Sequence, residues 1–164
     1  ISPYAKTNVV QLKDNKISEI TIDPKELKIE ANKLEDLVGD DAILIILAGV
    51  STKVADDLYS EALNLNMSVI VEVHTVDEAK SALRFEDALI GINNRNLKTL
   101  KTDINTTFDI HDVLINHPGP LISESGIKTK KELIEISNKT SIKTFLIGES
   151  LLRDLDNNSI FSVL

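Results

Sequence analysis

Polar side chains that are costly to bury follow an apolar segment in the stretch GINNRNL, residues 91–97. Each such group that is buried without a partner costs about 1–3 kcal/mol. A chain that keeps these groups at the end of a strand must therefore pair them, and a bound ligand is one way to do so. Asn94 is expected to shape the turn, because asparagine tolerates left-handed backbone angles. Asn93, which lies nearest to the apolar segment, is the better candidate for ligand binding.

Two glutamates lie within apolar runs, Glu72 in SVIVEVH and Glu124 in PLISES. An acid in such a run usually has a charged partner or a function. Glu72 can pair with a lysine of a neighbouring loop, but we favour a functional role. His74 can lie in the loop or contact the backbone at the start of the next helix, and a catalytic role is the alternative.

Glycines follow the last two apolar runs, in Ser125-Gly126 and in Gly148-Glu149. They can be ordinary turn residues. Glycine just before a helix also lets the backbone approach an anion and directs free amides at it. In eight-stranded barrels the phosphate site follows the last two strands. We therefore expect a phosphate or sulfate ion between the loops that begin at Ser125 and Gly148.

Five short apolar runs must position these residues. They are too short for buried helices and rich in β-branched residues, so they predict strands that are buried on both faces of a parallel sheet. The runs are AILIILAG (42–49), SVIVEVH (68–74), ALIGIN (88–93), PLISES (120–125) and TFLIGES (144–150). Ligands bind at the carboxyl ends of such strands, which is where the polar residues lie.

Amphipathic segments with helix-start signals separate the runs. Ser51 precedes one of them, and Thr75-Val-Asp-Glu78 and Thr129-Lys-Lys-Glu132 have the spacing of a capping box. Asp23-Pro24-Lys25-Glu26 opens an earlier helix, with proline at the first helical position. The alternation of strands and helices predicts parallel strands joined by right-handed crossovers.

The first 23 residues follow a different pattern. Asn8–Leu12 and Ile17–Ile22 flank the polar tetrapeptide KDNK and predict either a hairpin or two separate short strands. No linker or low-complexity segment divides the chain. We therefore expect one domain over residues 1–164, with βα units over residues 24–164.

Composition excludes several classes of protein. The 164 residues contain no cysteine, which excludes disulfides and thiolate zinc sites. A net charge of −8 and an aromatic content of 4% argue against a nucleic-acid-binding surface. The longest apolar run, 42–50, is far too short to cross a bilayer. We expect a soluble, cytoplasmic protein that holds an anionic ligand through a local site.

Four motifs in this order, VEVH, GINNRNL, SESGI and LIGESLLR, resemble the indole-3-glycerol-phosphate synthase family. The resemblance covers about residues 42–155, and IDPKEL at 22–27 is similar to a further family segment. It implies a (β/α)8 barrel of the TIM type. It also implies a carboxy-lyase of tryptophan biosynthesis, which closes the ring of a carboxyphenylamino-deoxyribulose phosphate with loss of carbon dioxide and water. The resemblance implies no metal ion and no organic cofactor.

The resemblance also implies roles for individual residues. Glu72 matches a glutamate of the family that takes part in proton transfer, and Asn93 matches a substrate-positioning asparagine. Glu124 and Ser125 match a pair at the end of the seventh strand. The residues implied around the phosphate, largely through backbone amides, are Ser125, Gly126, Gly148 and Glu149, with Arg95 and Lys98 adding local positive charge.

The front of the chain departs from the family pattern. The general acid of the family is a lysine, and the resemblance places Ser18 at that position; a serine cannot protonate a carbonyl as an ammonium group can. Barrels of this type take about 250 residues, and five strands cannot close one. We therefore expect a barrel that is truncated or incomplete on its N-terminal side.

Three other interpretations stay open. The chain can be a partial barrel that binds phosphate without catalysis. It can be another phosphosugar barrel enzyme, such as an isomerase of the same pathway, which shares the phosphate glycines but not the Glu72 and Asn93 pair. Two copies can also complete each other as a homodimer.

Overall fold

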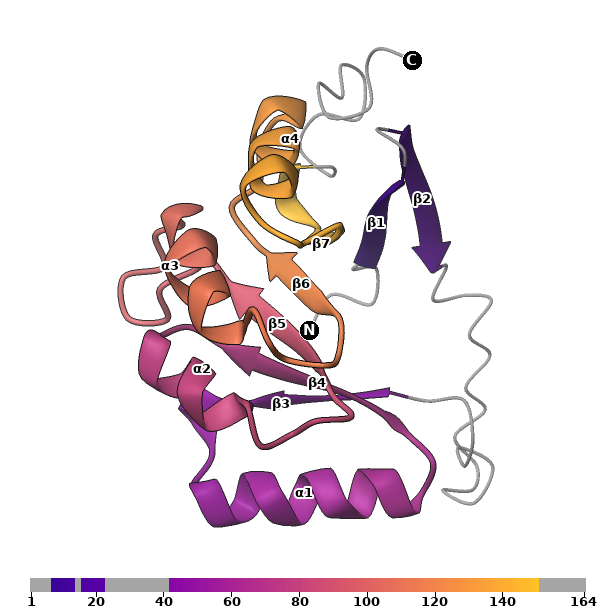
Figure 1. Cartoon of the computed structure of the whole chain (residues 1–164), viewed down its shortest axis with the longest axis vertical. Helices are drawn as coiled ribbons and strands as arrows, with labels where there is room; N and C mark the ends of the chain where they lie inside the picture. Colours follow the sequence, from indigo (N-terminus) through magenta and orange to yellow (C-terminus); the bar gives the residue numbers. More distant parts are fainter. Residues whose placement is uncertain (1–6, 14–15, 23–41, 151–164) are drawn as a thin grey trace.

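The computed structural model describes residues 7–13, 16–22 and 42–150, and these residues form one curved seven-stranded sheet with helices along its outer side (Figure 1). The strand order is β2-β1-β7-β6-β5-β4-β3. The strands are β1 Thr7–Lys13, β2 Lys16–Ile22, β3 Ala42–Ile46, β4 Ser68–Val73, β5 Leu89–Asn93, β6 Leu121–Glu124 and β7 Thr144–Ile147. Strands β3 to β7 pair in parallel with their sequence neighbours, which confirms the five predicted strands and their direction.

Helices follow the parallel strands in the predicted alternation. They are the short 3-10 helix η2 Leu47–Gly49 and the α-helices α1 Thr52–Asn64, α2 Val76–Ala82, α3 Asn105–Leu114 and α4 Lys130–Lys139. None of these described helices is long and apolar enough to cross a membrane. The predicted helix at Asp23–Glu26 lies outside the described residues.

The helix starts follow from local hydrogen bonds. The Ser51 hydroxyl accepts a bond from the amide of Val54 at the start of α1. At α4, Thr129 and Glu132 form the predicted reciprocal capping box, in which the hydroxyl and the carboxylate each satisfy a free amide. At α2, the Thr75 hydroxyl caps the amide of Glu78 as predicted, but the Glu78 carboxylate accepts the amide of His74, at 2.7 Å.

The two faces of the sheet differ in burial. On the outer face, alternate residues such as Val71, Ile90 and Phe145 are completely buried against the helices. On the inner face, Leu44 and Ile46 at the β3 edge are 50% and 37% exposed. The interior of a closed barrel is filled by side chains. The open inner face at β3 is therefore that of a partial barrel, as the sequence predicted, and the prediction of strands buried on both faces is wrong at β3.

The apolar side of helix α1 is exposed as well. Its buried residues are Ala55 and Ala62, whereas the apolar side chains of Val54, Leu58 and Leu65 are exposed. The helix packs on β3 and β4 at the edge of the sheet, and no other described helix covers the apolar side. The outer edge of the described fold is therefore apolar at both the strand and the helix.

The N-terminal segment forms the hairpin that was one of two predictions. Strands β1 and β2 are antiparallel and pair from Thr7 with Ile22 to Lys13 with Lys16. Strand β1 also pairs antiparallel with β7, with Asn8 opposite Ile147. The hairpin is therefore added to the sheet beside β7, with β1 running antiparallel to β7.

Candidate active site

The carboxyl ends of β4, β5 and β6 bring the predicted catalytic residues to one edge of the sheet. Glu72 of β4 is in register with Gly91 of β5, and Asn93 of β5 is in register with Glu124 of β6. Residues in one row of a sheet point to the same face, and so do residues two apart in a strand. Glu72, Asn93 and Glu124 therefore lie on the inner face.

Glu72 and Glu124 form a buried carboxyl pair. They are only 6% and 2% exposed. Desolvation, followed by the charge of Glu72 and a hydrogen bond with it, raises the pKa of Glu124 from 4.5 to about 8. At neutral pH Glu124 therefore keeps its proton. One carboxylic acid and one neighbouring carboxylate are thus ready to donate and to accept a proton.

Gly91 makes room for this pair. A Cβ atom at Gly91 would lie 2.1 Å from Oε1 of Glu124, far inside van der Waals contact. The Glu124 carboxyl group therefore occupies the space that a side chain at position 91 would fill. This explains the glycine of the GIN motif, for which the sequence alone offered no function.

Asn93 and Arg95 are held by the loop that follows β5. The Asn93 Oδ1 atom accepts a bond from the amide of Arg95 at 2.9 Å, which is an Asx-type turn. The Arg95 guanidinium donates to the carbonyl of Leu100 and to Oε2 of Glu149, at 3.2 and 3.0 Å. The Arg95 and Glu149 side chains are 33% and 55% exposed. The structure thus pairs two predicted anion-site residues with each other at the rim.

Ser125 and Gly126 form a turn in which both residues have left-handed backbone angles, with φ of 63° and 73°. A Cβ atom at Gly126 would lie 2.6 Å from Cβ of Thr102, so glycine is required by both angle and space. The amide of Ser125 donates to the carbonyl of Leu146 in β7. Around Gly148, by contrast, nothing lies within 4 Å of an added Cβ.

The loop before α4 is paired with a side chain of that helix. The Glu132 carboxylate accepts the amides of Lys128 and Thr129, at 2.7 and 2.8 Å. These two amides are therefore not free to bind an anion near the Ser125-Gly126 turn.

A buried polar network below this turn was missed by the sequence analysis. Asn94 is 2% exposed, and its Nδ2 atom donates to Oγ of Ser123 and to the carbonyl of Ser125, both at 3.1 Å. Its Oδ1 atom accepts from the amide and the hydroxyl of Thr107. Asn94 therefore holds the Ser125 turn in place through its side chain. The predicted left-handed backbone angle at Asn94 is wrong, since Asn94 does not have a positive φ. The only sequence signal was a serine inside the apolar run LISE.

His74 lies beside the carboxyl pair. Its ring Nε2 atom is 3.1 Å from Oε1 of Glu72, and its side chain is 7% exposed. His74 lies in the loop, as one of the predictions stated, but its ring makes no hydrogen bond to the backbone at the start of α2. Instead, its own backbone amide donates to the Glu78 carboxylate. The ring position beside Glu72 was not predicted.

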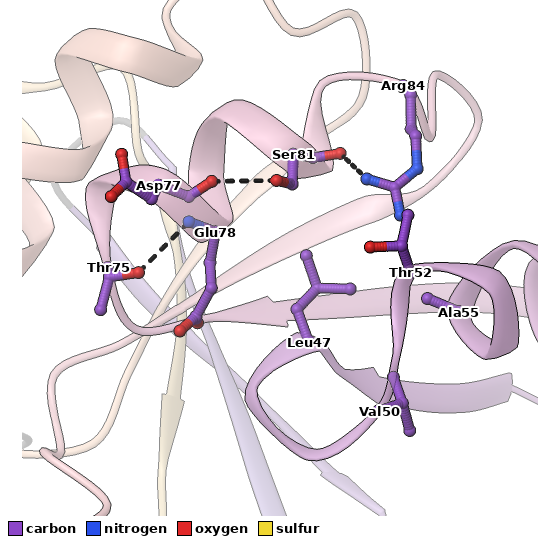
Figure 2. A pocket seen from close by; sticks show the side chains of 9 residues that line it. All are labelled: Leu47, Val50, Thr52, Ala55, Thr75, Asp77, Glu78, Ser81 and Arg84. Carbon is purple, nitrogen blue, oxygen red and sulfur yellow. Dashed lines mark hydrogen bonds between the residues drawn. The ribbon is translucent and has the colours of Figure 1, made fainter.

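A separate cavity of about 290 Å³ lies between the start of α1 and helix α2 (Figure 2). None of the eight predicted site residues lines it. Its lining consists of Leu47, Val50, Thr52, Ala55, Thr75, Asp77, Glu78, Ser81 and Arg84. The cavity is therefore outside the carboxyl pair but reaches the loop that contains His74.

Comparison with known proteins decides the family. The family model described as indole-3-glycerol phosphate synthase matches residues 7–163. The chain belongs to this family. The family assignment confirms the resemblance that the four motifs indicated. Together with the five parallel strands, it also confirms the predicted partial (β/α)8 barrel.

Relatives within the indole-3-glycerol phosphate synthase family are similar over most of this chain. The protein of that name from Burkholderia ambifaria is 40% identical over 116 residues, which is 71% of this chain and 44% of the relative. The one from Magnetococcus marinus is 44% identical over 126 residues, which is 76% of this chain and 44% of the relative. The chain thus spans less than half the length of these curated relatives.

Solved structures are less similar. A crystal structure of a NadC deletion mutant has a TM-score of 0.47 and 16% sequence identity, and it covers 64% of this chain and 35% of that chain. Similarity at this level supports no conclusion about function.

Ser18, which the resemblance places at the position of the general acid, lies in the N-terminal hairpin. It is the third residue of β2, the outermost strand on one side of the described sheet, and it pairs with Gln11. Strands β1, β7 and β6 lie between β2 and β5 in the sheet.

Proposed function

We propose that this protein is catalytically active and carries out the indole-3-glycerol-phosphate synthase reaction. The substrate would be 1-(2-carboxyphenylamino)-1-deoxyribulose 5-phosphate, which closes its ring with loss of carbon dioxide and water. The observation that carries the proposal is the buried pair of Glu72 and Glu124 beside Asn93, because ring closure and dehydration both need positioned proton donors and acceptors. The proposed reaction uses no metal ion and no organic cofactor.

The proposed catalytic roles follow from burial and protonation. Glu124, which keeps its proton at neutral pH, acts as an acid. Glu72 accepts protons beside it, and Asn93 positions the substrate between the two. Water exclusion at this end of the sheet strengthens each of these interactions.

The proposed phosphate site is more exposed. The Ser125-Gly126 turn and the Gly148 loop bind the phosphate group through the amides of Gly126 and Gly148, because glycine allows close approach of an anion. The Ser125 amide donates to the Leu146 carbonyl and holds the turn in place. Arg95 and Glu149 lie at the edge of this site as an ion pair. A bound phosphate would compete with Glu149 for the Arg95 guanidinium. Binding of the substrate would therefore exchange this ion pair for a contact between Arg95 and the phosphate.

The experiment that tests the activity is direct. The substrate is added to the full chain and the fluorescence of the indole product is followed. We expect slow product formation, which Glu72→Gln and Glu124→Gln each reduce by about 10²–10⁴-fold. No product from the parent chain would contradict the proposed activity of this chain.

Phosphate binding separates this proposal from a partial barrel without catalysis. Titration of inorganic phosphate should shift the amide NMR signals of Ser125, Gly126 and Gly148. Binding without any product would favour the non-catalytic interpretation. No shift at these three amides would reject the proposed anion site.

A lysine at position 18 tests the match to the general acid of the family. If the match is correct, Ser18→Lys raises product formation. No gain with phosphate binding intact would favour an incomplete barrel, which is the result that the position of Ser18 in an edge strand favours.

We further propose that residues 1–164 form one cytoplasmic domain that binds a phosphorylated small molecule and no nucleic acid. The exposed Leu44 and Ile46 on the inner face suggest a second copy that completes the barrel as a homodimer. Measurement of mass in solution tests this, since a monomer at micromolar concentration would reject the homodimer.

A further inference from the structure

The ring of His74 lies between two carboxylates that come from different elements. Its Nε2 atom is 3.1 Å from Oε1 of Glu72 in β4, and its Nδ1 atom is 3.4 Å from Oε2 of Glu78 in α2. Although both distances are short, neither ring nitrogen has a hydrogen bond of normal geometry within the described part of the chain. A buried imidazole with two unsatisfied nitrogens is costly, so its position requires an explanation.

The equivalent position of α4 shows that helix capping does not require this arrangement. Glu132 lies three residues after its N-cap, as Glu78 does, and it serves two backbone amides with no histidine beside it. At α2, one oxygen of Glu78 accepts the His74 amide and also faces the His74 ring. The α2 cap therefore connects a carboxylate to the imidazole, which the α4 cap does not.

Glu78 extends this connection towards water. Its side chain is 23% exposed, whereas those of His74 and Glu72 are each 7% exposed. Glu78 also lines the cavity between α1 and α2 (Figure 2). On the other side, Glu72 contacts Glu124 of β6. The four groups thus run from the buried carboxyl pair to a water-accessible cavity.

We propose that His74 is a positioning residue that passes protons between Glu72 and Glu78 and so restores the protonation state of the buried carboxyl pair. An imidazole can accept a proton at one nitrogen and release a proton from the other. The Glu72 carboxyl group gives its proton to Nε2, and Nδ1–H gives its proton to the Glu78 carboxylate. One proton enters the ring and one leaves it, so the net charge of the ring does not change.

The catalytic use of this route rests on the proposed function, because Glu72 must change its protonation state in each turnover. The route itself does not need substrate. Without His74 the buried pair has a slower path to solvent, so proton exchange at Glu124 should slow down. This effect can be measured in the full chain whether or not it forms product.

The test follows the carboxyl carbon signal of Glu124 by NMR through its titration near pH 8. We expect one averaged signal in the parent chain and broadened or separate signals in His74→Gln and in Glu78→Gln. Glu132→Gln, which changes the matched capping residue of α4, should behave as the parent chain does. If His74→Gln fails to fold, Glu78→Gln still tests the proton route, because it leaves the His74 ring in place.

Product formation is measured on the same variants. If the parent chain is active, His74→Gln should lower kcat by about 10²-fold, near the lower limit for proton-transfer groups, with KM unchanged. Unchanged exchange at Glu124 in both His74→Gln and Glu78→Gln would overturn the proton route even if the parent chain is active. Slowed exchange in a chain that forms no product would support the route and reject the proposed function instead.

Discussion

Two pairs of charged side chains lie at the same edge of the sheet, and they differ in burial and in sign. Glu72 and Glu124 carry like charges when ionised and are almost completely buried. Arg95 and Glu149 carry opposite charges and are 33% and 55% exposed. Glu124 has a pKa raised to about 8 by desolvation and by Glu72. The exposed pair is surrounded by water, which screens its attraction.

Burial therefore determines which of the two pairs can do acid–base chemistry. In a buried site, two neighbouring carboxyl groups cannot both ionise cheaply, so one of them keeps its proton at neutral pH. In water an ion pair contributes little to stability but can exchange partners easily. The buried pair thus suits proton transfer, and the exposed pair suits reversible contact with an anionic substrate.

The largest effect is expected from pH, through Glu124. In the unfolded chain this carboxyl group ionises near 4.5, but in the folded chain it keeps its proton up to about pH 8. Between these values the folded state binds more protons, so the free energy of unfolding falls as pH rises, by on the order of a few kcal/mol. Urea denaturation from pH 4.5 to 8.5 measures this slope.

Glu124→Gln is the matching variant, because it removes the titration and keeps the shape of the side chain. Its stability should vary less with pH over this window, and it should exceed that of the parent chain at pH 8.5. Glu135→Gln, at an exposed carboxylate beside Lys139, should leave the slope unchanged. An equal slope in the parent chain and in Glu124→Gln would show that the buried pair is not protonated as described.

The second effect concerns Asn94, which lies under the turn between the two pairs. Asn94→Ala removes the hydrogen bonds of Asn94 to Thr107, Ser123 and the Ser125 carbonyl. The two hydroxyl groups then keep only their bond to each other. We expect a loss of about 2–3 kcal/mol in the free energy of unfolding. Urea denaturation measures it, with Asn138→Ala at an exposed position of α4 as the control. A loss equal to that of the control would mean that water replaces the network.

The third effect is expected from a side chain added at Gly91, which lies beside the buried pair of Glu72 and Glu124. Gly91→Ala places a methyl group where the Glu124 carboxyl lies, so this carboxyl must move away. Overpacking of this kind costs about 1–3 kcal/mol, and we expect the lower end because the clashing atoms end a flexible side chain. The NMR titration midpoint of Glu124 should fall below 8 as it leaves Glu72. Gly49→Ala, where nothing lies within 4 Å of an added Cβ, should change neither quantity.

The smallest effect is expected at the exposed pair. Arg95→Gln should lower the free energy of unfolding by less than about 1 kcal/mol, and the difference should shrink further in high salt. Phosphate affinity should fall more clearly than stability does, if the pair acts as proposed. A salt-independent loss of several kcal/mol would show that the pair is structural rather than part of an anion site.

The sequence by itself determined the local elements, because their causes are local. Strand length, β-branched composition and capping residues such as Thr129 and Glu132 act within a few residues of each other. They sufficed to predict the five parallel strands, the starts of α1, α2 and α4, and the edge at which the polar residues gather. The polar tetrapeptide KDNK between two apolar segments likewise indicated a hairpin as one of two possible structures.

Only the tertiary structure decided which of these residues meet. Glu72 and Glu124 are far apart in the chain, and their shared proton depends on the register of three strands and on the space left by Gly91. The His74 ring between Glu72 and Glu78, the Asn94 network and the reversed pairing of β1 with β7 have the same origin. These features arise from packing between distant segments and from the exclusion of water. Periodicity or spacing within one segment predicts neither the packing nor the exclusion of water.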